Sequence, residues 1–140
     1  MYGALEISTS GMIAQRTRLE AYTANIANAA TFTDALGRNI PYARREVYFA
    51  PGTSAMAGSR TQKGQALGVR VAAIGQDHTF QIRHEPSNPL ADEKGYVKYP
   101  NINTVFEQMN AYDAMRAYEA NLAAAEATKA MMAQALRLIA

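Results

Sequence analysis

The stretch from Thr104 to Ala140 contains neither glycine nor proline, and this constrains the fold more than any other feature of the sequence. Its apolar residues recur in alternating steps of four and three, the heptad pattern of a coiled-coil seam. Thr104 and Glu107 form a capping-box pattern after Pro100, which predicts a helix start near Asn103 or Thr104. The predicted stripe consists of Ala111, Met115, Tyr118, Leu122, Ala125, Lys129, Met132, Leu136 and Ile139, of which only Lys129 is charged.

The length of this helix determines how the chain can be organised. A helix from Thr104 to Ile139 is about 54 Å long, whereas a compact domain of 140 residues has a diameter of roughly 37 Å. The helix must therefore project, and a projecting apolar seam requires a partner. Apolar residues on its other faces favour burial against further subunits, although alanine is also common on solvated helical faces.

A partner is available within the same chain. Residues 1–33 are predicted to form an N-terminal helical segment in which Leu5, Met12, Leu19 and Ile26 recur every seven residues. We expect this stripe to pair with the C-terminal helix. Gly11 weakens the N-terminal helix but lets another backbone come close.

The middle of the chain, residues 34–100, has a different character. All five prolines lie there, between short β-like runs at 43–49, 67–74 and 78–83. The segment 52–66 is rich in glycine, serine and alanine and is predicted to be a mobile loop. The predicted fold class is α+β, with long N- and C-terminal helices that pair as a coiled coil, the second within 101–140, and a small β-rich unit inserted between them.

The sequence predicts no catalytic, cofactor-binding or metal site. It has no cysteine and no nucleophile-elbow motif. The segment 58–64 lacks the lysine that follows the second glycine in a phosphate-binding loop. His78 and His84 lie about 20 Å apart on a strand, too far for one metal ion, and are predicted to flank a buried apolar pair, Phe80 and Ile82. Asp92 and Glu93 are interpreted as a solvated turn. We therefore expect no small-molecule substrate.

Charge and hydropathy exclude two further classes. The formal net charge is only +2, and Arg44 and Arg45 form the only adjacent basic pair, so no nucleic acid is expected. No apolar run is long enough to span a membrane. The first residues do not resemble a secretory signal, since Glu6 lies where the apolar region would be. If the chain leaves the cytoplasm, we expect it to do so without a cleaved signal peptide.

These observations favour a structural protein that assembles through its terminal helices. The alternative is a free-standing coiled-coil adapter or periplasmic interaction module, which would form a discrete small oligomer. An enzyme with a pocket around His78 or His84 ranks third, because the spacing of the two histidines disfavours it.

Four segments carry a resemblance to a known family. ANIANA at 24–29, ALGRNIPYARREVYF at 35–49, GVRVAAI at 68–74 and EPSNPLADEKGYVKYPNIN at 85–103 are similar to segments of the bacterial flagellar rod and hook axial proteins, and most closely of the proximal-rod members. Parts of the C-terminal helix, at 116–121 and 129–132, also resemble that family. The residues that match the family motifs are Asn25, Asn28, Asn88, Pro89, Asp92, Gly95 and Tyr96.

The resemblance implies a structural subunit of the proximal rod, the periplasmic shaft that transmits motor torque to the distal rod and hook. It implies export through the flagellar type III apparatus. The implied partners are copies of the chain itself, the rod proteins FlgB, FlgF and FlgG, the FliE adapter and the MS ring. The residues predicted to form the assembly interface are Leu5, Met12, Leu19, Ile26, Met115, Tyr118, Leu122, Met132, Leu136 and Ile139.

Overall fold

The computed structural model describes residues 2–52 and 68–139, so the predicted loop at 52–66 lies, apart from Gly52, outside the described residues. Two long helices enclose four strands in the chain order. The elements are α1 (Tyr2–Ala27), β1 (Arg44–Pro51), β2 (Val69–Asp77), β3 (Phe80–His84), β4 (Tyr96–Pro100) and α2 (Thr104–Ile139). The predicted α+β class is confirmed.

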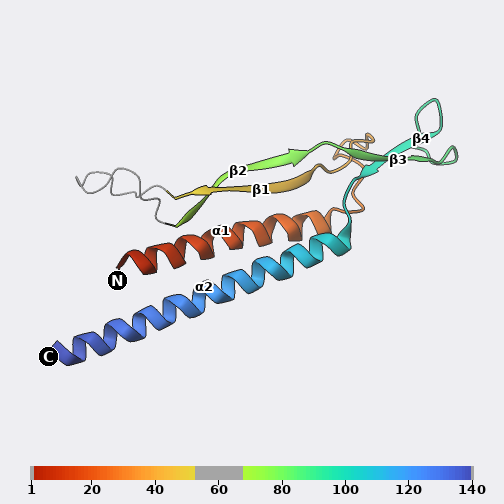
Figure 1. Ribbon diagram of the computed structural model, residues 1–140. Helices are drawn as coiled ribbons and strands as arrows, with labels where there is room; N and C mark the ends of the chain where they lie inside the picture. The colour runs from red at the N-terminus through yellow and green to blue at the C-terminus, as the bar shows by residue number, and fades with distance from the viewer. Residues whose placement is uncertain (1, 53–67, 140) are drawn as a thin grey trace.

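The molecule is elongated (Figure 1). Helices α1 and α2 run antiparallel side by side, and α1 also packs against the ribbon formed by β1 and β2. The hairpin of β3 and β4 lies beyond the end of the helix pair where α1 finishes and α2 begins (Figure 1). The start of α1 and the end of α2 are both at the opposite end of the molecule (Figure 1).

Helix α2 begins at Thr104, as predicted, but its cap differs from the prediction. The Asn103 side-chain oxygen accepts hydrogen bonds from the backbone N–H groups of Val105 at 3.0 Å and Phe106 at 3.4 Å, so Asn103 is the N-cap. The predicted capping box of Thr104 and Glu107 is wrong, because the Glu107 side chain is buried and bonded to other elements.

The line of α2 residues that faces α1 shares every second residue with the predicted stripe. At the positions between them, the buried residue is the one before the predicted residue. In the pairs Ala114 and Met115, Asn121 and Leu122, and Thr128 and Lys129, the first residue is the more buried one. The observed line, again in steps of four and three, consists of Glu107, Ala111, Ala114, Tyr118, Asn121, Ala125 and Thr128. Residues that are mostly small allow α1 to approach closely, and the shift leaves the Lys129 charge in solvent.

A close approach at Gly11 shows why small residues form this line. Gly11 is buried, and a Cβ atom built on it would lie 2.7 Å from the side-chain oxygen of Asn121. A larger residue would require the Asn121 side chain to shift. Gly11 therefore lets α2 come close, although the group that meets it is a side chain and not the backbone that was expected.

Helix α2 extends past the start of α1 (Figure 1). Gly11 lies against Asn121 and Asn25 against Glu107, which places Tyr2, the first residue of α1, level with Ala130. The segment Met131–Ile139, about 14 Å long, has no neighbouring turn of α1. Its Leu138 side chain is 88% exposed.

The β unit contains one strand more than the predicted runs. Strands β1 and β2 pair antiparallel with an irregularity after Tyr48, and β3 pairs antiparallel with β4 from Phe80 opposite Pro100 to His84 opposite Tyr96. The three predicted runs correspond to β1, β2 and β3, and β4 was not predicted. The prediction that Phe80 and Ile82 are a buried pair is wrong, since Ile82 is 65% exposed.

Candidate assembly interface

A buried polar cluster joins α1, β1 and α2 at one end of the helix pair. The Asn25 side chain is fully buried. Its oxygen accepts a hydrogen bond from the backbone N–H of Arg45 at 2.8 Å, and its amide nitrogen donates to the Arg45 carbonyl at 2.9 Å and to the Glu107 carboxylate at 2.9 Å. Asn25 thus pairs with one residue of β1 as a neighbouring strand would, while its second N–H group reaches α2.

Glu107 links this polar cluster to Arg44 in strand β1. Its carboxylate, 1% exposed, accepts a hydrogen bond from the Arg44 guanidinium at 2.7 Å, and Arg44 in turn bonds Glu46 at 2.7 Å. Burial acts to lower the pKa of Arg44, but the hydrogen bond and the attraction of Glu107 outweigh it and raise that pKa above its usual value. Each buried polar group of this pair has a partner.

The same junction fixes the end of α1. The amide nitrogen of Asn28 donates to the Ala24 carbonyl at 2.8 Å, and the backbone N–H of Asn28 donates to the same carbonyl at 3.1 Å. The side chain thus adds a second hydrogen bond to a carbonyl of the last turn of α1. Asn25 and Asn28 therefore have different tasks, since Asn25 bonds across elements and Asn28 bonds within the end of α1.

The β ribbon is attached to α1 near the other end of the helix. The Ser10 hydroxyl donates to the Ile7 carbonyl at 2.7 Å and accepts from the backbone N–H of Val69 at 3.1 Å. Gly68, at a positive φ of 81°, lies so close to Ser10 that a Cβ atom would collide with its hydroxyl. Two polar attachments, at Ser10 and Asn25, hold the ribbon along α1.

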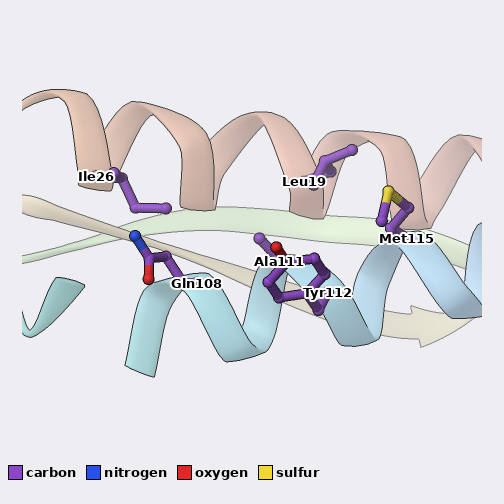
Figure 2. A pocket seen from close by; sticks show the side chains of 6 residues that line it. All are labelled: Leu19, Ile26, Gln108, Ala111, Tyr112 and Met115. Atoms are coloured by element: carbon purple, nitrogen blue, oxygen red, sulfur yellow. The ribbon is translucent and has the colours of Figure 1, made fainter. Parts of the chain in front are cut away.

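An open groove of about 290 Å³ runs between the two helices. Figure 2 shows Leu19 and Ile26 on α1 facing Gln108, Ala111, Tyr112 and Met115 on α2. The structure therefore brings three residues of the predicted interface, Leu19, Ile26 and Met115, to one place. None of the six lining side chains is charged, and most are apolar.

The predicted interface residues border the helix seam or lie beyond it, and they are not fully buried. Leu5, Met12, Leu19, Ile26, Tyr118 and Met132 are half-buried. Met115, Leu122 and Leu136 are 40%, 41% and 68% exposed. The side chain of Ile139 lies outside the described residues. The residues up to Leu122 lie beside the α1–α2 seam, whereas Met132 and Leu136 lie on the part of α2 that extends past α1. The isolated chain leaves all of them partly in water.

Further exposed apolar residues lie near the start of α2 and adjoin the groove through Tyr112. Val105, Phe106, Met109 and Tyr112 are all more than half exposed. Large apolar patches on a small protein mark contact surfaces, whereas single exposed apolar residues are common. Helix α2 therefore has exposed apolar residues on more than one face, as its sequence predicted.

The other family-motif residues form the turn between β3 and β4. The Asn88 side-chain oxygen accepts from the backbone N–H of Leu90 at 3.1 Å, and Gly95, at a φ of 77°, donates its N–H to the Asp92 carbonyl at 2.8 Å. The N–H of Asp92 donates to the Tyr96 carbonyl at 3.0 Å. Pro89 is exposed. This motif builds a hairpin turn remote from the helix pair.

The described residues contain no arrangement that suggests catalysis. His78 and His84 are exposed, and His84 packs its ring against Tyr96 with a centroid distance of 5.1 Å. Within residues 2–52 and 68–139, no group of three or more His, Asp or Glu side chains could hold a metal ion. In the same part of the chain, no helix is long and apolar enough to cross a membrane.

Sequence reasoning missed the junction of Glu107, Arg44 and the Arg45 backbone. Glu107 was interpreted as part of a local cap, and Arg44 only as half of a basic pair. A signal was present in part: the asparagine-rich segment was singled out, but a partner eighty-two residues away cannot be identified from local pattern.

Two antiparallel helices with a polar clamp at one end, and with apolar side chains left outside the pair, are typical of a structural subunit that completes its core by assembly. Comparison with known proteins gives the class more closely. Residues 5–31 match the family described as flagella basal body rod protein, and residues 93–138 match the C-terminal family of the flagellar basal body rod FlgEFG proteins.

Curated relatives match over nearly the whole chain. The flagellar basal-body rod protein FlgC of Borreliella burgdorferi is 32% identical, with 99% of this chain and 97% of the relative covered. FlgC of Escherichia coli O6:H1 is 37% identical, with 95% and 93% covered, and FlgC of Aquifex aeolicus is 36% identical, with 92% and 90% covered. The chain belongs to the FlgC family of flagellar basal-body rod proteins, and it is a structural rod subunit of the basal body.

Proposed function

We propose that this chain forms part of the proximal rod and assembles helically through its terminal helices into the drive shaft that transmits motor torque to the distal rod and hook. The observation that carries the proposal is the set of apolar side chains left outside the α1–α2 seam, among them Met115, Leu122 and Leu136. Two helices cannot enclose these side chains, and neighbouring subunits would.

The proposed interface consists of the residues that border the seam and of those on the part of α2 that extends past α1. On α1 it includes Leu5, Met12, Leu19 and Ile26, which are half-buried in the single chain. On α2 it includes Met115, Tyr118, Leu122, Met132, Leu136 and Ile139. Many contacts of this kind, distributed along a tube, give torsional stiffness without depending on one strong site. Head-to-tail contacts whose rotation does not close generate a helical assembly.

We also propose the partners and the location in detail. The partners are further copies of the chain, the rod proteins FlgB, FlgF and FlgG, the FliE adapter, the MS ring and the flagellar type III export apparatus. The location is the periplasmic rod, reached without a cleaved signal peptide. Membership of the rod family supports assembly with other basal-body rod components, and the individual partners are the part of the proposal that goes further.

The proposal includes the absence of an enzymatic role. Replacing His78 and His84 together with glutamine is therefore expected to leave swimming intact, because both side chains are exposed. The measurement is the swimming rate, together with the amount of the variant in purified basal bodies. A variant that assembles at the wild-type level and cannot swim would show that the histidines have a chemical role.

The direct test is complementation in a motile relative of the source organism whose own gene for this subunit has been deleted. Expression of this chain should restore swimming, and the chain should be detected in purified basal bodies, with electron cryomicroscopy placing it in the proximal rod. Its absence from basal bodies that are otherwise complete would contradict the proposal. The free-standing adapter predicts instead one discrete small oligomer of the purified protein by light scattering.

A further inference from the structure

The outer edges of β1 and β2 are both obstructed. The Asn25 side chain bonds the two backbone groups of Arg45 on β1 at 2.8 and 2.9 Å, and β1 ends at Pro51, which has no N–H group. On β2 the register skips Ala72, so this strand carries an irregularity. Prolines and irregularities of this kind keep the edges of a sheet from pairing with further strands.

The hairpin of β3 and β4 has one obstructed edge and one open edge. On β4, the Asn39 side chain accepts a hydrogen bond from the Lys98 N–H at 3.0 Å and donates to the Lys98 carbonyl at 3.1 Å, and the strand ends at Pro100. On β3, the residues from Gln81 to His84 are all exposed. In the described part of the chain, no group outside β4 bonds to the backbone of β3. Strand β3 therefore keeps an unobstructed edge.

The hydrogen bonds of Asn39 also show which backbone groups of β3 point outward. Because the N–H and the carbonyl of Lys98 face Asn39, they point away from β3, and in an antiparallel pair the residue directly opposite points away as well. That residue is Ile82, and the alternation of the strand gives Phe80 and His84 the same orientation. The hairpin lies beyond the end of the helix pair (Figure 1), so a second copy can approach this edge without displacing a helix.

The edge of β3 is complementary to itself. In an antiparallel pair centred on Ile82, the two copies of Ile82 lie opposite each other and Phe80 lies opposite His84. All three outward-facing residues of each copy then take part, with about six main-chain hydrogen bonds, and the Ile82 side chains, 65% exposed in the single chain, contact each other. A shift of the pair by two residues would place His84 opposite His78, or Phe80 opposite Pro86, which has no N–H group.

The charges of β3 allow the same pairing. Arg83 is the one lysine or arginine of the strand, and it would lie opposite Gln81 of the second copy. Its guanidinium lies over the Tyr99 ring, 5.0 Å from the centroid, and is thus directed toward β4. The pair therefore places no two like charges directly opposite each other.

We propose that the free chain forms a weak dimer in which β3 pairs antiparallel with β3 of a second copy, so that the two hairpins make one four-stranded sheet. Two strands of five residues make a small interface, which gives a reversible contact. This inference goes beyond the proposed function. The two copies of a two-fold pair point in opposite directions, whereas the subunits of a helical shaft all point the same way, so the dimer has to open before either copy enters a rod.

The absence of cysteine from the chain permits a direct test by cross-linking. In the proposed pair the two copies of residue 82 have Cα atoms about 5.5 Å apart, which a disulfide can bridge. Mild oxidation of purified Ile82→Cys should therefore give a covalent dimer at least tenfold faster than oxidation of Leu36→Cys. Leu36 is a stringent control because it is 77% exposed, more than Ile82, and lies outside all strands.

A second variant tests the backbone pairing without a cross-link. Ile82→Pro removes an N–H group that β4 does not use, so the hairpin should still form, while the dimer measured by sedimentation at high protein concentration should weaken at least tenfold. The matched control is Ile74→Pro on β2, at a side chain 53% exposed. Counting from Gln76, which lies opposite Arg45, the same alternation turns the N–H of Ile74 outward. This control should dimerise like the wild type, and circular dichroism should show equal structure in both variants.

The outcomes separate this inference from the proposed function. Cross-linking of Ile82→Cys at the rate of Leu36→Cys, or dimerisation of a folded Ile82→Pro at wild-type strength, would overturn the inference and leave the rod role standing. A discrete oligomer that persists in Ile82→Pro would instead indicate the free-standing adapter, whose contacts are made by the helices. Absence of the wild-type chain from complete basal bodies would overturn the proposed function and not the dimer.

Discussion

The two ends of the helix pair satisfy their side chains in different ways. Where α1 finishes and α2 begins, Asn25 and Glu107 are buried and bonded to β1 at 2.7 to 2.9 Å. At the other end, α2 extends beyond α1 with Leu136 and Leu138 largely in water. The buried polar groups of the first end find their partners within one chain, whereas the apolar side chains of the second end do not.

The difference shows that polar and apolar contacts have different roles in this protein. Hydrogen bonds have directions, so the junction permits only one register of α1 against α2 and β1. Apolar contacts are not directional, and those at the far end can be supplied by any surface of suitable shape. A subunit of a shaft needs both, a fixed shape of its own and an apolar surface for its neighbours.

The largest effect is expected from breaking the junction with Glu107→Ala. Loss of this carboxylate leaves one amide N–H of Asn25 without a partner and removes one of the two carboxylates that bond the partly buried Arg44 guanidinium. The expected cost is about 3 kcal/mol in the free energy of unfolding. Urea unfolding of the purified chain measures the loss. The control is Glu119→Ala, an exposed site on the same helix, with an expected effect within about 0.5 kcal/mol. Equal stability of the two variants would show that the hydrogen bonds of Glu107 do not stabilise the fold.

A smaller effect is expected midway between the two ends, at Gly11. In Gly11→Ala the added Cβ would lie 2.7 Å from the Asn121 side chain, so we expect a loss of about 1 kcal/mol despite the better helix propensity of alanine. Adding Asn121→Ala removes the obstructing group and should restore stability. Thermal unfolding of the two single variants and the double variant gives the coupling between the sites. A zero coupling energy would contradict the close approach.

The smallest effect is expected in the β3–β4 hairpin, which belongs to neither end. Hydrogen bonds from Asn88 and Tyr99 lower the pKa of Glu85 below its usual 4.5. The hydrogen bond that the Tyr99 hydroxyl donates to Glu85 raises the pKa of Tyr99 above its usual 10.0. Glu85 therefore stabilises the hairpin above pH 4.5, and this contribution is lost as the pH falls through its lowered pKa. Tyr99 stabilises the hairpin below pH 10.0, and this contribution is lost as the pH rises through its raised pKa.

Amide exchange of β4 measured across pH tests this window. Protection should be greatest between the two values and should decline on both sides. Tyr99→Phe should remove the alkaline decline and weaken the acidic one, because Phe cannot donate to Glu85. An unchanged pH profile in Tyr99→Phe would show that this hydrogen bond does not stabilise the hairpin.

Most of the fold could be predicted from the sequence, because its signals are local. The absence of glycine and proline defined α2, its start lies at Thr104 as expected, and three of the four strands follow β-like runs. Strand β4 was missed because its five residues contain a lysine and end at Pro100, so that only pairing with β3 makes the segment a strand.

The details of the interface could be predicted only in part. Heptad counting assigned Met115, Leu122 and Lys129 to the seam. The more buried residues are instead Ala114, Asn121 and Thr128, of which Asn121 lies against Gly11. The role of Glu107 depends on Asn25 and Arg44, which are distant in sequence. Patterns of neighbouring residues cannot show whether Glu107 completes a helix cap or bonds to residues that are distant in the sequence.

Leu122→Asp tests most directly the central claim that apolar side chains beside the seam are buried by neighbouring subunits. Leu122 is 41% exposed in the single chain, so its replacement should change the stability of the free subunit by less than about 1 kcal/mol. In a rod, the same carboxylate would be buried without a partner in every copy. The account predicts that Leu122→Asp is made but is nearly absent from purified basal bodies and that the cells do not swim, while Ala127→Asp, exposed on another side of α2, is incorporated and motile. Incorporation of Leu122→Asp at the wild-type level in swimming cells would contradict the account.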